Sequence, residues 1–267
     1  MTIDTLNPDA ATDTAATVYG SLKDRHVLIT GGGTGIGEAI VEGFARQGAK
    51  VSFIDIAEEA SHKLVERLTP GSRHGPTFTR CDLRNIAALE QTIASIEAAN
   101  GPIEILINNA ANDDRHQVGA ITPEYWDNRM AVNLRHLFFA SQAAARSMRK
   151  AGRGVIINFS SISWHLALPD LVLYQTAKAG IEGMTRGLAR ELGADGIRVN
   201  AIIPGAVRTA RQDLLWQSPD DVQRTLEQQC IKERVMPVDV AALVLFLCSD
   251  DARACTAHSY FVDAGWA

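Results

Sequence analysis

The chain has 267 residues, of which 46% are hydrophobic, and its formal net charge at pH 7 is -5. This length suits one large α/β domain, and the apolar fraction is enough to build a sizeable core. No basic block is longer than RSMRK (146–150), so the charge pattern argues against nucleic acid as a partner. No run reaches the roughly 18 apolar residues that a membrane span needs, and we expect a soluble protein without a membrane partner.

The N-terminal stretch MTIDTLNPDAATDTAATVYG contains no Lys or Arg and lacks the basic start of a secretory signal. We interpret residues 1–20 as a flexible leader and residues 21–267 as one domain, because no Pro/Gly-rich linker divides the rest of the chain. The four cysteines show no CxxC or Cys/His ligand spacing, and they are Cys81, Cys230, Cys248 and Cys255. We therefore expect reduced thiols, no metal site and a cytoplasmic location.

In chain order, short β-rich runs alternate with helical patterns. The β-rich runs are RHVLIT (25–30), KVSFID (50–55), TFTR (77–80), IEILI (103–107), GVIINF (154–159), IRVNAII (197–203) and SYFV (259–262). The helical patterns cover residues 36–48, 87–99, 124–150, 173–193 and 238–250. Most of the β-rich runs are almost continuously apolar, which is typical of parallel strands with helices on both faces. The alternation predicts a single α/β domain with a Rossmann-like, doubly wound parallel sheet of about seven strands.

A glycine-rich turn, GGGTGIG (31–37), separates the first strand from the first helix. Glycine costs about 0.5 to 1 kcal/mol relative to alanine inside a helix or strand, so the cluster requires a turn or a close neighbour. In this position the missing Cβ atoms let the backbone approach a pyrophosphate at the positive end of the helix. A structural loop explains the glycines about equally well when they are taken alone.

The second strand ends in a carboxylate, Asp55, eighteen residues after Gly37. A carboxylate at this place accepts hydrogen bonds from an adenosine ribose and repels the 2′-phosphate of NADP. Thr34, Ile56 and Ala57 supply no positive charge for such a phosphate, so the pattern favours NAD over NADP. The alternative for Asp55 is a solvated strand-end or helix-capping acid.

A second group of polar residues follows the strand GVIINF. Ser160 and Ser161 come directly after this strand, and strand ends in open α/β sheets face the ligand crevice. In YQTAK, Tyr174 and Lys178 are four residues apart and project from one helix face, a spacing that also arises by chance on many helices. A tyrosine with a pKa near 10 is a poor base, and a lysine ammonium one turn away is expected to lower that pKa. We predict Tyr174 as the base for a substrate hydroxyl.

Taken together, these motifs resemble the short-chain dehydrogenase/reductase family over residues 22–266. The matching residues, in family order and spacing, are the turn from Thr30 to Gly37, NNA (108–110), Asn133, Ser161, Tyr174, Lys178 and PG (204–205). Within the family, NDDRH (112–116), the stretch from 158 to 186 and the ending YFVDAGWA look similar to NAD-dependent aldose 1-dehydrogenases of the D-xylose type. Two departures are Ala111, where the family usually has glycine, and VDAGW in place of the commoner VDGGW.

The resemblance implies a site, a cofactor and a reaction. It implies Asn133, Ser161, Tyr174 and Lys178 as catalytic residues. It implies that NAD is bound by Gly31, Thr34, Gly35, Ile36, Gly37, Asp55, Asp82, Leu83, Asn109, Ala110, Ala111, Tyr174, Lys178, Pro204, Gly205, Val207 and Thr209. Asp82 would reach the adenine amino group, although a helix N-cap explains it nearly as well. Ser161 would hold the reacting oxygen, Lys178 would also bind the nicotinamide ribose, and Asn133 would anchor a water of the proton relay. The implied reaction is the oxidation of an aldose at C1 to the aldonolactone.

The composition of two strand-exit loops independently suits a polyol. AANDDRH (110–116) and SWH (163–165) carry amide, carboxylate, guanidinium, imidazole and indole groups, whereas steroid or acyl-chain pockets are predominantly apolar. The candidate sugar contacts are Asn112, Ser161, Trp164, Tyr174, Gln175 and Arg208. Trp164 and His165 could instead have packing or structural roles, and Asp114 and Arg115 could form a surface ion pair with each other.

Three alternatives stay open at the level of the sequence. The substrate could be another sugar or sugar acid, such as L-arabinose, galactose, L-fucose or a keto-deoxy sugar acid. The chain could be an NADPH-dependent carbonyl or 3-oxoacyl reductase, which Asp55 opposes, or an NAD(H)-sensing module, which has no need for Ser161, Tyr174 and Lys178. Helical segments at 123–150 and 172–193 are available for a symmetric four-helix interface, and the resemblance implies a homotetramer.

Overall fold

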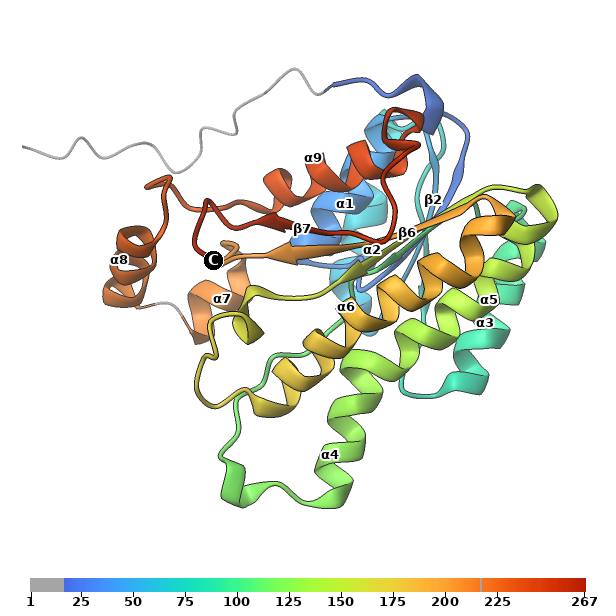
Figure 1. The fold of residues 1–267 in the computed structure, drawn as a ribbon. Coiled ribbons are helices and arrows are strands. Elements are labelled where there is room, and N and C mark those ends of the chain that lie inside the picture. The colour runs from blue at the N-terminus through green and yellow to red at the C-terminus, as the bar shows by residue number, and fades with distance from the viewer. Residues whose placement is uncertain (1–16, 217) are drawn as a thin grey trace, which may run out of the picture.

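Seven parallel strands form one sheet in the computed structural model, which describes residues 17–216 and 218–267 (Figure 1). The strand order is β3-β2-β1-β4-β5-β6-β7. The strands are β1 (His26–Thr30), β2 (Lys50–Asp55), β3 (Thr77–Arg80), β4 (Ile105–Asn108), β5 (Gly154–Phe159), β6 (Ile197–Pro204) and β7 (Ser259–Val262). The order reverses between β1 and β4, so the carboxyl ends of these two strands border the crevice where such sheets bind ligands. The predicted fold class is confirmed.

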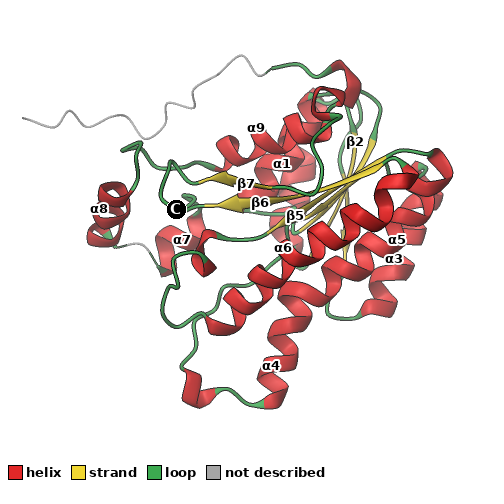
Figure 2. Ribbon diagram, viewed as in Figure 1, coloured by secondary structure: helices red, strands yellow, loops and turns green. Residues whose placement is uncertain are grey.

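Helices cover both faces of the sheet (Figure 2). The helices are α1 (Gly35–Arg46), α2 (Glu58–Leu68), α3 (Ile86–Asn100), α4 (Pro123–Met130), α5 (His136–Ala151), α6 (Val172–Leu192), α7 (Ala210–Leu215), α8 (Pro219–Gln228) and α9 (Pro237–Cys248). The helices α1 and α9 pack together on one face, and α3 packs against α5 on the other. The carboxyl end of β6 leads into α7 and α8.

The continuous apolar character of the strands follows from these two layers. In β1, Val27 and Ile29 point into the core beneath α1 and α9, while Leu28 between them points into the core beneath α3 and α5. All three side chains are fully buried. Successive residues of a strand face opposite sides of the sheet, so a strand covered on both sides is apolar at every position.

Several element boundaries differ from those expected. The single helix predicted over 124–150 is three pieces, because a π-helical turn (Ala131–Arg135) separates α4 from α5. The fourth strand begins at Ile105, two residues later than the apolar run. Three helices, α2, α7 and α8, were not predicted, because α2 and α8 are largely polar and α7 has only six residues.

The start of the described chain is attached to the domain. The backbone N–H of Tyr19 donates to Gln47 Oε1 at 2.7 Å, and Gln47 Nε2 donates to the carbonyl of Thr17 at 2.8 Å. Most of the expected leader, residues 1–16, lies outside the described residues. Within the described part of the chain, no helix is long and apolar enough to cross a membrane.

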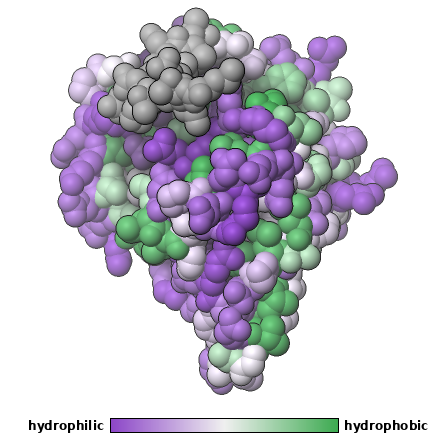
Figure 3. All heavy atoms as spheres, turned by 90° about the vertical axis from the view of Figure 1, so that its left-hand side faces the viewer, coloured by the Kyte–Doolittle hydropathy of each residue, from purple (hydrophilic) through white to green (hydrophobic). Residues whose placement is uncertain are grey.

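Figure 3 views the molecule from the side of α7 and α8 and shows apolar patches set among polar surface. In α7, Leu214 is 82% exposed and Leu215 is 44% exposed. The polar side chains of this helix, Arg211 and Gln212, bind the loop after β4 at the candidate site described next.

Candidate active site

The glycine-rich turn closes tightly between β1 and α1. Gly31 has a φ of +68°, and its N–H donates to the carbonyl of Ile54 at 2.7 Å. A Cβ on Gly37 would lie 1.8 Å from the carbonyl oxygen of Gly31, so only glycine fits there. Thr34, which precedes α1, makes no side-chain capping bond, and the first N–H groups of the helix stay available to an anion. This cradle fits the pyrophosphate of a dinucleotide.

Asp55 is bound into the same turn. Its Oδ2 accepts a hydrogen bond from the N–H of Gly33 at 2.8 Å. Its Oδ1 accepts from the N–H groups of Ile56 and Ala57 at 2.7 and 2.9 Å. The carboxylate is half-buried beside the glycines, and a carboxylate has about four acceptor positions, so one remains for a ribose hydroxyl. The arrangement fits the ribose role expected for Asp55.

Segments that follow three different strands meet at this turn. Asn109, directly after β4, donates from Nδ2 to the carbonyl of Gly31 at 2.8 Å, and its own N–H donates to Thr30 Oγ1 at 3.1 Å. A Cβ on Gly35 would lie 3.2 Å from the Thr209 methyl group, which places the segment after β6 against the glycines. The other residues expected around the cofactor are Ile36 at the start of α1, Leu83 after β3, Ala110 and Ala111 after β4, and Pro204, Gly205 and Val207 at and after the end of β6.

Asp82 has a local partner of its own. The Arg84 guanidinium donates to both of its carboxylate oxygens, at distances between 2.7 and 3.1 Å, and holds the pKa of Asp82 below its usual value. The capping alternative is wrong, because Asn85 is the residue that caps α3, through the N–H of Ala88. The contact of Asp82 with adenine stays a prediction.

Ser161, Tyr174 and Lys178 come together at the carboxyl end of β5. Lys178 is buried in α6, and its Nζ donates to the carbonyl of Phe159 at 2.7 Å. The same Nζ lies 5.3 Å from the centroid of the Tyr174 ring. The Ser161 side chain lies close enough to the Tyr174 hydroxyl to lower the pKa of that hydroxyl, against the larger effect of burial. The group unites a hydroxyl that can hold a substrate oxygen, a phenol and an amine.

The electrostatics of this group differ from the expectation drawn from the sequence. Burial raises the pKa of Tyr174 above its ordinary value, and the negative charge of Asp113 raises it further. Burial lowers the pKa of Lys178 to about 7, against a smaller opposing effect of Asp113. Both side chains lose water, which disfavours the phenolate and the ammonium alike. The residues of the chain alone therefore do not lower the pKa of Tyr174.

Asn133 is fully buried in the π-helical turn between α4 and α5. Its Oδ1 accepts from the N–H of Asn112 at 2.8 Å, and its Nδ2 donates to the carbonyl of Asn112 at 3.0 Å. Single π turns inside helices are frequent at functional sites. Because both groups of the carboxamide bind Asn112, Asn133 positions the loop after β4, and its contact with a water stays a prediction.

The candidate sugar contacts are engaged in different ways. Gln175 donates from Nε2 to the carbonyls of Ser163 and Leu168, so it fastens the loop after β5 to α6. Arg208 pairs with Asp213 at 3.1 Å. The Asn112 Oδ1 accepts from the N–H of Asp114 at 2.8 Å and from Arg129 Nη1 at 3.2 Å. These three side chains have structural partners of their own in the chain.

Glu182 organises the loop that carries Ser161, and sequence reasoning missed it. Its Oε1 accepts from Ser160 Oγ at 2.8 Å and from Trp164 Nε1 at 2.6 Å, and it lies 3.2 Å from His165 Nε2. Its Oε2 accepts from Ser259 Oγ of β7 at 3.2 Å. Trp164 and His165 therefore both have a partner within the fold, which is consistent with the structural roles considered for them as an alternative to sugar contacts. The sequence does place this acid one helical turn after Lys178, on the same face of the predicted helix, and that spacing could have marked it as a candidate site residue.

The polar loop after β4 forms ion pairs that were also missed. Asp114 pairs with Arg129 at 3.4 Å and with Arg211 of α7 at 2.7 Å. The expected pair between Asp114 and Arg115 is wrong, because the Arg115 guanidinium lies 5.0 Å from the Trp216 ring and donates to a backbone carbonyl. The charges of this loop reach across the site to α7 instead of neutralising one another locally.

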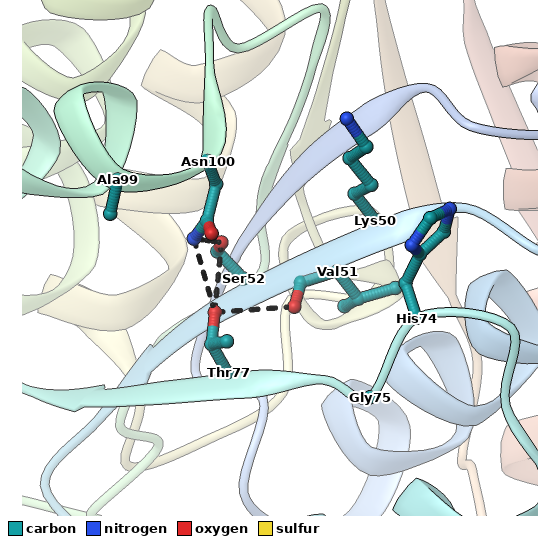
Figure 4. A pocket seen from close by; sticks show the side chains of 8 residues that line it. All are labelled: Lys50, Val51, Ser52, His74, Gly75, Thr77, Ala99 and Asn100. Carbon is teal, nitrogen blue, oxygen red and sulfur yellow. Dashed lines mark hydrogen bonds between the residues drawn. The ribbon is translucent and has the colours of Figure 1, made fainter.

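A separate hollow of about 220 Å³ lies at the amino ends of β2 and β3 (Figure 4). Its polar walls bind one another, since Thr77 Oγ1 and Asn100 Nδ2 both donate to Ser52 Oγ, at 3.1 and 3.2 Å. In a parallel sheet this edge is opposite the carboxyl ends that carry Tyr174 and Asp55. The hollow therefore takes no part in the site built above.

The chain is similar to known dehydrogenases and reductases over nearly its whole length. The family model described as Enoyl-(Acyl carrier protein) reductase matches residues 31–267. The chain is 54% identical to D-xylose 1-dehydrogenase of Caulobacter vibrioides over 252 residues, which cover 94% of this chain and 99% of that protein. It is 47% identical to a protein named as a probable galactose dehydrogenase of Rhizobium meliloti, over 92% of this chain and 96% of that protein.

A solved structure of a short-chain type dehydrogenase/reductase from Mycobacterium ulcerans superposes with a TM-score of 0.87 and 25% sequence identity. The match covers 92% of this chain and 90% of that one. The glycine turn, the serine, tyrosine and lysine group and these similarities over nearly the whole domain lead to one conclusion: the chain belongs to the short-chain dehydrogenase/reductase family.

Proposed function

We propose that this protein oxidises an aldose at C1 to the aldonolactone with reduction of NAD to NADH, as a sugar dehydrogenase of the D-xylose type. The observation that carries the proposal is the grouping of Ser161, Tyr174 and Lys178 next to a glycine turn that holds the Asp55 carboxylate. The similarity to a D-xylose and a probable galactose dehydrogenase supports an aldose as substrate.

Each residue of the group has a chemical task in this proposal. The Ser161 hydroxyl binds the anomeric oxygen, and Tyr174 accepts the proton that this oxygen loses. Lys178 in its charged form stabilises the phenolate and binds the nicotinamide ribose. When bound, NAD would supply the hydride acceptor and the positive charge of its nicotinamide ring, which would add to the charge of Lys178 beside Tyr174.

The choice of NAD over NADP rests on Asp55. The three backbone N–H groups that bind its carboxylate fix a negative charge at the turn, where a 2′-phosphate would meet repulsion. Ile56, the next residue, is 66% exposed and uncharged. This feature also argues against an NADPH-dependent carbonyl or 3-oxoacyl reductase.

Initial rates across a panel of pentoses and hexoses, each with NAD and with NADP, test the proposal. We expect NADH formation with D-xylose or a closely related aldose and a preference for NAD. Replacing Asp55 with Ala and Ile56 with Arg should shift the ratio of kcat/KM values toward NADP, with Asp220→Asn on the exposed surface of α8 as the control. No turnover with any aldose, or an unchanged cofactor ratio in the double variant, contradicts the respective half of the proposal.

We further propose a cytoplasmic homotetramer. Apolar side chains are exposed on three neighbouring helices, with Trp126 of α4 at 43%, Phe138 of α5 at 40% and Val172 of α6 at 42%. Such side chains on adjoining helices suit an interface between copies of the chain. The four cysteines are free thiols, which fits a reducing compartment.

A further inference from the structure

Two aspartates of the loop after β4 are connected to α7. The Arg211 guanidinium donates to Asp113 Oδ1 at 3.3 Å and to Asp114 Oδ1 at 2.7 Å. The neighbouring Gln212 donates from Nε2 to Asp113 Oδ2 at 2.8 Å. Together these bonds fasten a short helix with apolar, exposed leucines to the rim of the candidate site.

The two carboxylates differ in their surroundings. The Asp114 side chain is 51% exposed and also faces the buried Arg129. The Asp113 side chain is only 24% exposed, and each of its oxygens accepts one hydrogen bond from α7. A carboxylate oxygen has two acceptor positions, so Asp113 retains one on each oxygen for further donors.

Asp113 is near enough to the catalytic group for its charge to act there. Asn133 holds the backbone of the preceding residue, Asn112, through two hydrogen bonds, which fixes the loop beside the catalytic helices. The charge of Asp113 acts on both Tyr174 and Lys178 and raises the pKa of each. A negative charge beside a tyrosine that must lose its proton opposes catalysis, so this position calls for a compensating task.

We propose that Asp113 is a specificity-determining residue that accepts hydrogen bonds from a sugar hydroxyl beyond the reacting C1, while Arg211 and Gln212 hold its carboxylate and bring α7 over the sugar. The proposal rests on the proposed function, because it assigns the partner of the same site. A sugar hydroxyl is a donor that a carboxylate with a free acceptor position recognises. A simple carbonyl compound or an acyl chain without hydroxyl groups offers no such donors.

The test compares D-xylose with its 2-deoxy, 3-deoxy and 4-deoxy analogues in the wild type and in Asp113→Asn. The amide keeps the shape of the side chain but loses the charge and one acceptor. We expect kcat/KM for D-xylose to fall at least about tenfold in the variant, the scale of a hydrogen bond to a charged group. For the analogue that lacks the recognised hydroxyl, the same substitution should cause no loss of kcat/KM, because the contact is already absent and removal of the charge eases proton loss from Tyr174.

Asp220→Asn is the matched control, since it makes the same change on the exposed surface of α8. The KM for NAD and the melting temperature show whether each variant is folded, and Asp113→Ser replaces Asp113→Asn should the latter not fold. An equal loss for D-xylose and every analogue, or no loss at all, overturns the specificity role of Asp113. A wild-type enzyme that reduces no NAD with any aldose instead overturns the proposed function, and the role of Asp113 falls with it.

Discussion

The surroundings of Tyr174 set the main chemical demand on this site. Its side chain is half-buried, and burial together with the charge of Asp113 raises its pKa, against a smaller lowering effect of Ser161. The amine beside it, Lys178, has a pKa of about 7 because it too is buried. We therefore expect added positive charge, such as that of bound NAD, to favour loss of the tyrosine proton, which would couple deprotonation to cofactor binding.

Tyr174→Phe tests the assignment of the base. The phenyl ring keeps the packing against the Lys178 side chain but has no hydroxyl to accept the substrate proton. We expect kcat to fall by at least about a hundredfold, with the dissociation constant of NADH changed little. Steady-state rates and fluorescence titration with NADH measure the two quantities. Turnover near that of the wild type would place the base elsewhere.

A second buried base, His136 of α5, makes stability depend on pH. Burial and the nearby Lys178 lower its pKa from 6.5 to about 4. Between pH 6.5 and 4 the unfolded chain binds a proton that the folded chain excludes, so the free energy of unfolding falls as the pH falls through this window. Below about pH 4 both states are protonated and this contribution stays constant. The expected loss is about 3 kcal/mol at most.

Urea unfolding between pH 7 and 4 measures this dependence. In His136→Gln the amide can still donate to the carbonyl of Val132, which the imidazole reaches at 3.0 Å. The difference in unfolding free energy between the two proteins isolates the titration of His136 from that of the other histidines. Equal pH slopes for the variant and the wild type would show that this histidine is not held neutral.

At the scale of elements, the site depends on three loops that leave the carboxyl ends of β1, β4 and β6 and support one another. Asn109 after β4 binds the glycine turn after β1, and Thr209 after β6 lies over it. The turn is consequently held from two sides, and its shape does not depend on α1 alone. Disturbing it should affect cofactor binding before it affects the sheet.

Gly37→Ala probes this turn. The added methyl group would lie 1.8 Å from the carbonyl oxygen of Gly31, so the backbone must move away from its cradle shape. We expect the dissociation constant of NADH to rise at least about tenfold, because the first N–H groups of α1 would no longer point toward the pyrophosphate. Gly119→Ala is the control, because a Cβ there has no atom within 4 Å. Equal NADH affinities in the two variants would contradict the role of the turn.

The sequence predicted those parts of the molecule that depend on local pattern. The seven β-rich runs predicted the strands, and Asp55 lies against the glycine turn as its place at the end of the second strand suggested. Ser161, Tyr174 and Lys178, which the family resemblance implied, lie together at the carboxyl end of β5. The sequence pattern did not predict the contacts between segments that are far apart in the chain. Arg211 and Asp113 are 98 positions apart, and their ion pair depends on how β6 delivers α7 to the loop after β4.

The π-helical turn and the raised pKa of Tyr174 could not be predicted from the sequence, because both depend on contacts that form only in the folded chain. Nothing in the residues 131–135 distinguishes a π turn from an α-helix, and the bonds that Asn133 makes from this turn to the loop after β4 join segments that are distant in sequence. The pKa of a tyrosine depends on burial as much as on a nearby amine. Burial at a crevice can be measured only once the elements around it are in place.

In the molecule as a whole, the candidate active site lies at the carboxyl ends of the strands, and no function is proposed for the opposite, amino ends. The carboxyl ends carry the cofactor cradle, the catalytic group and α7, while the amino ends of β2 and β3 carry the polar hollow of Figure 4. Apolar side chains on α4, α5 and α6 leave another face for association. Light scattering should give four copies of the chain per particle, and a monomer at micromolar concentration would contradict the tetramer.

In the proposed reaction, hydride leaves C1 of an aldose while Tyr174 takes the proton of the anomeric hydroxyl. D-xylose deuterated at C1, incubated with NAD and the wild-type enzyme, tests it directly by mass spectrometry of both products. The predicted result is one deuterium in the reduced nicotinamide and none in the aldonolactone. Unlabelled NADH formed while the sugar is consumed would place the oxidation at another carbon, and no reduction of NAD with any aldose would contradict the claim altogether.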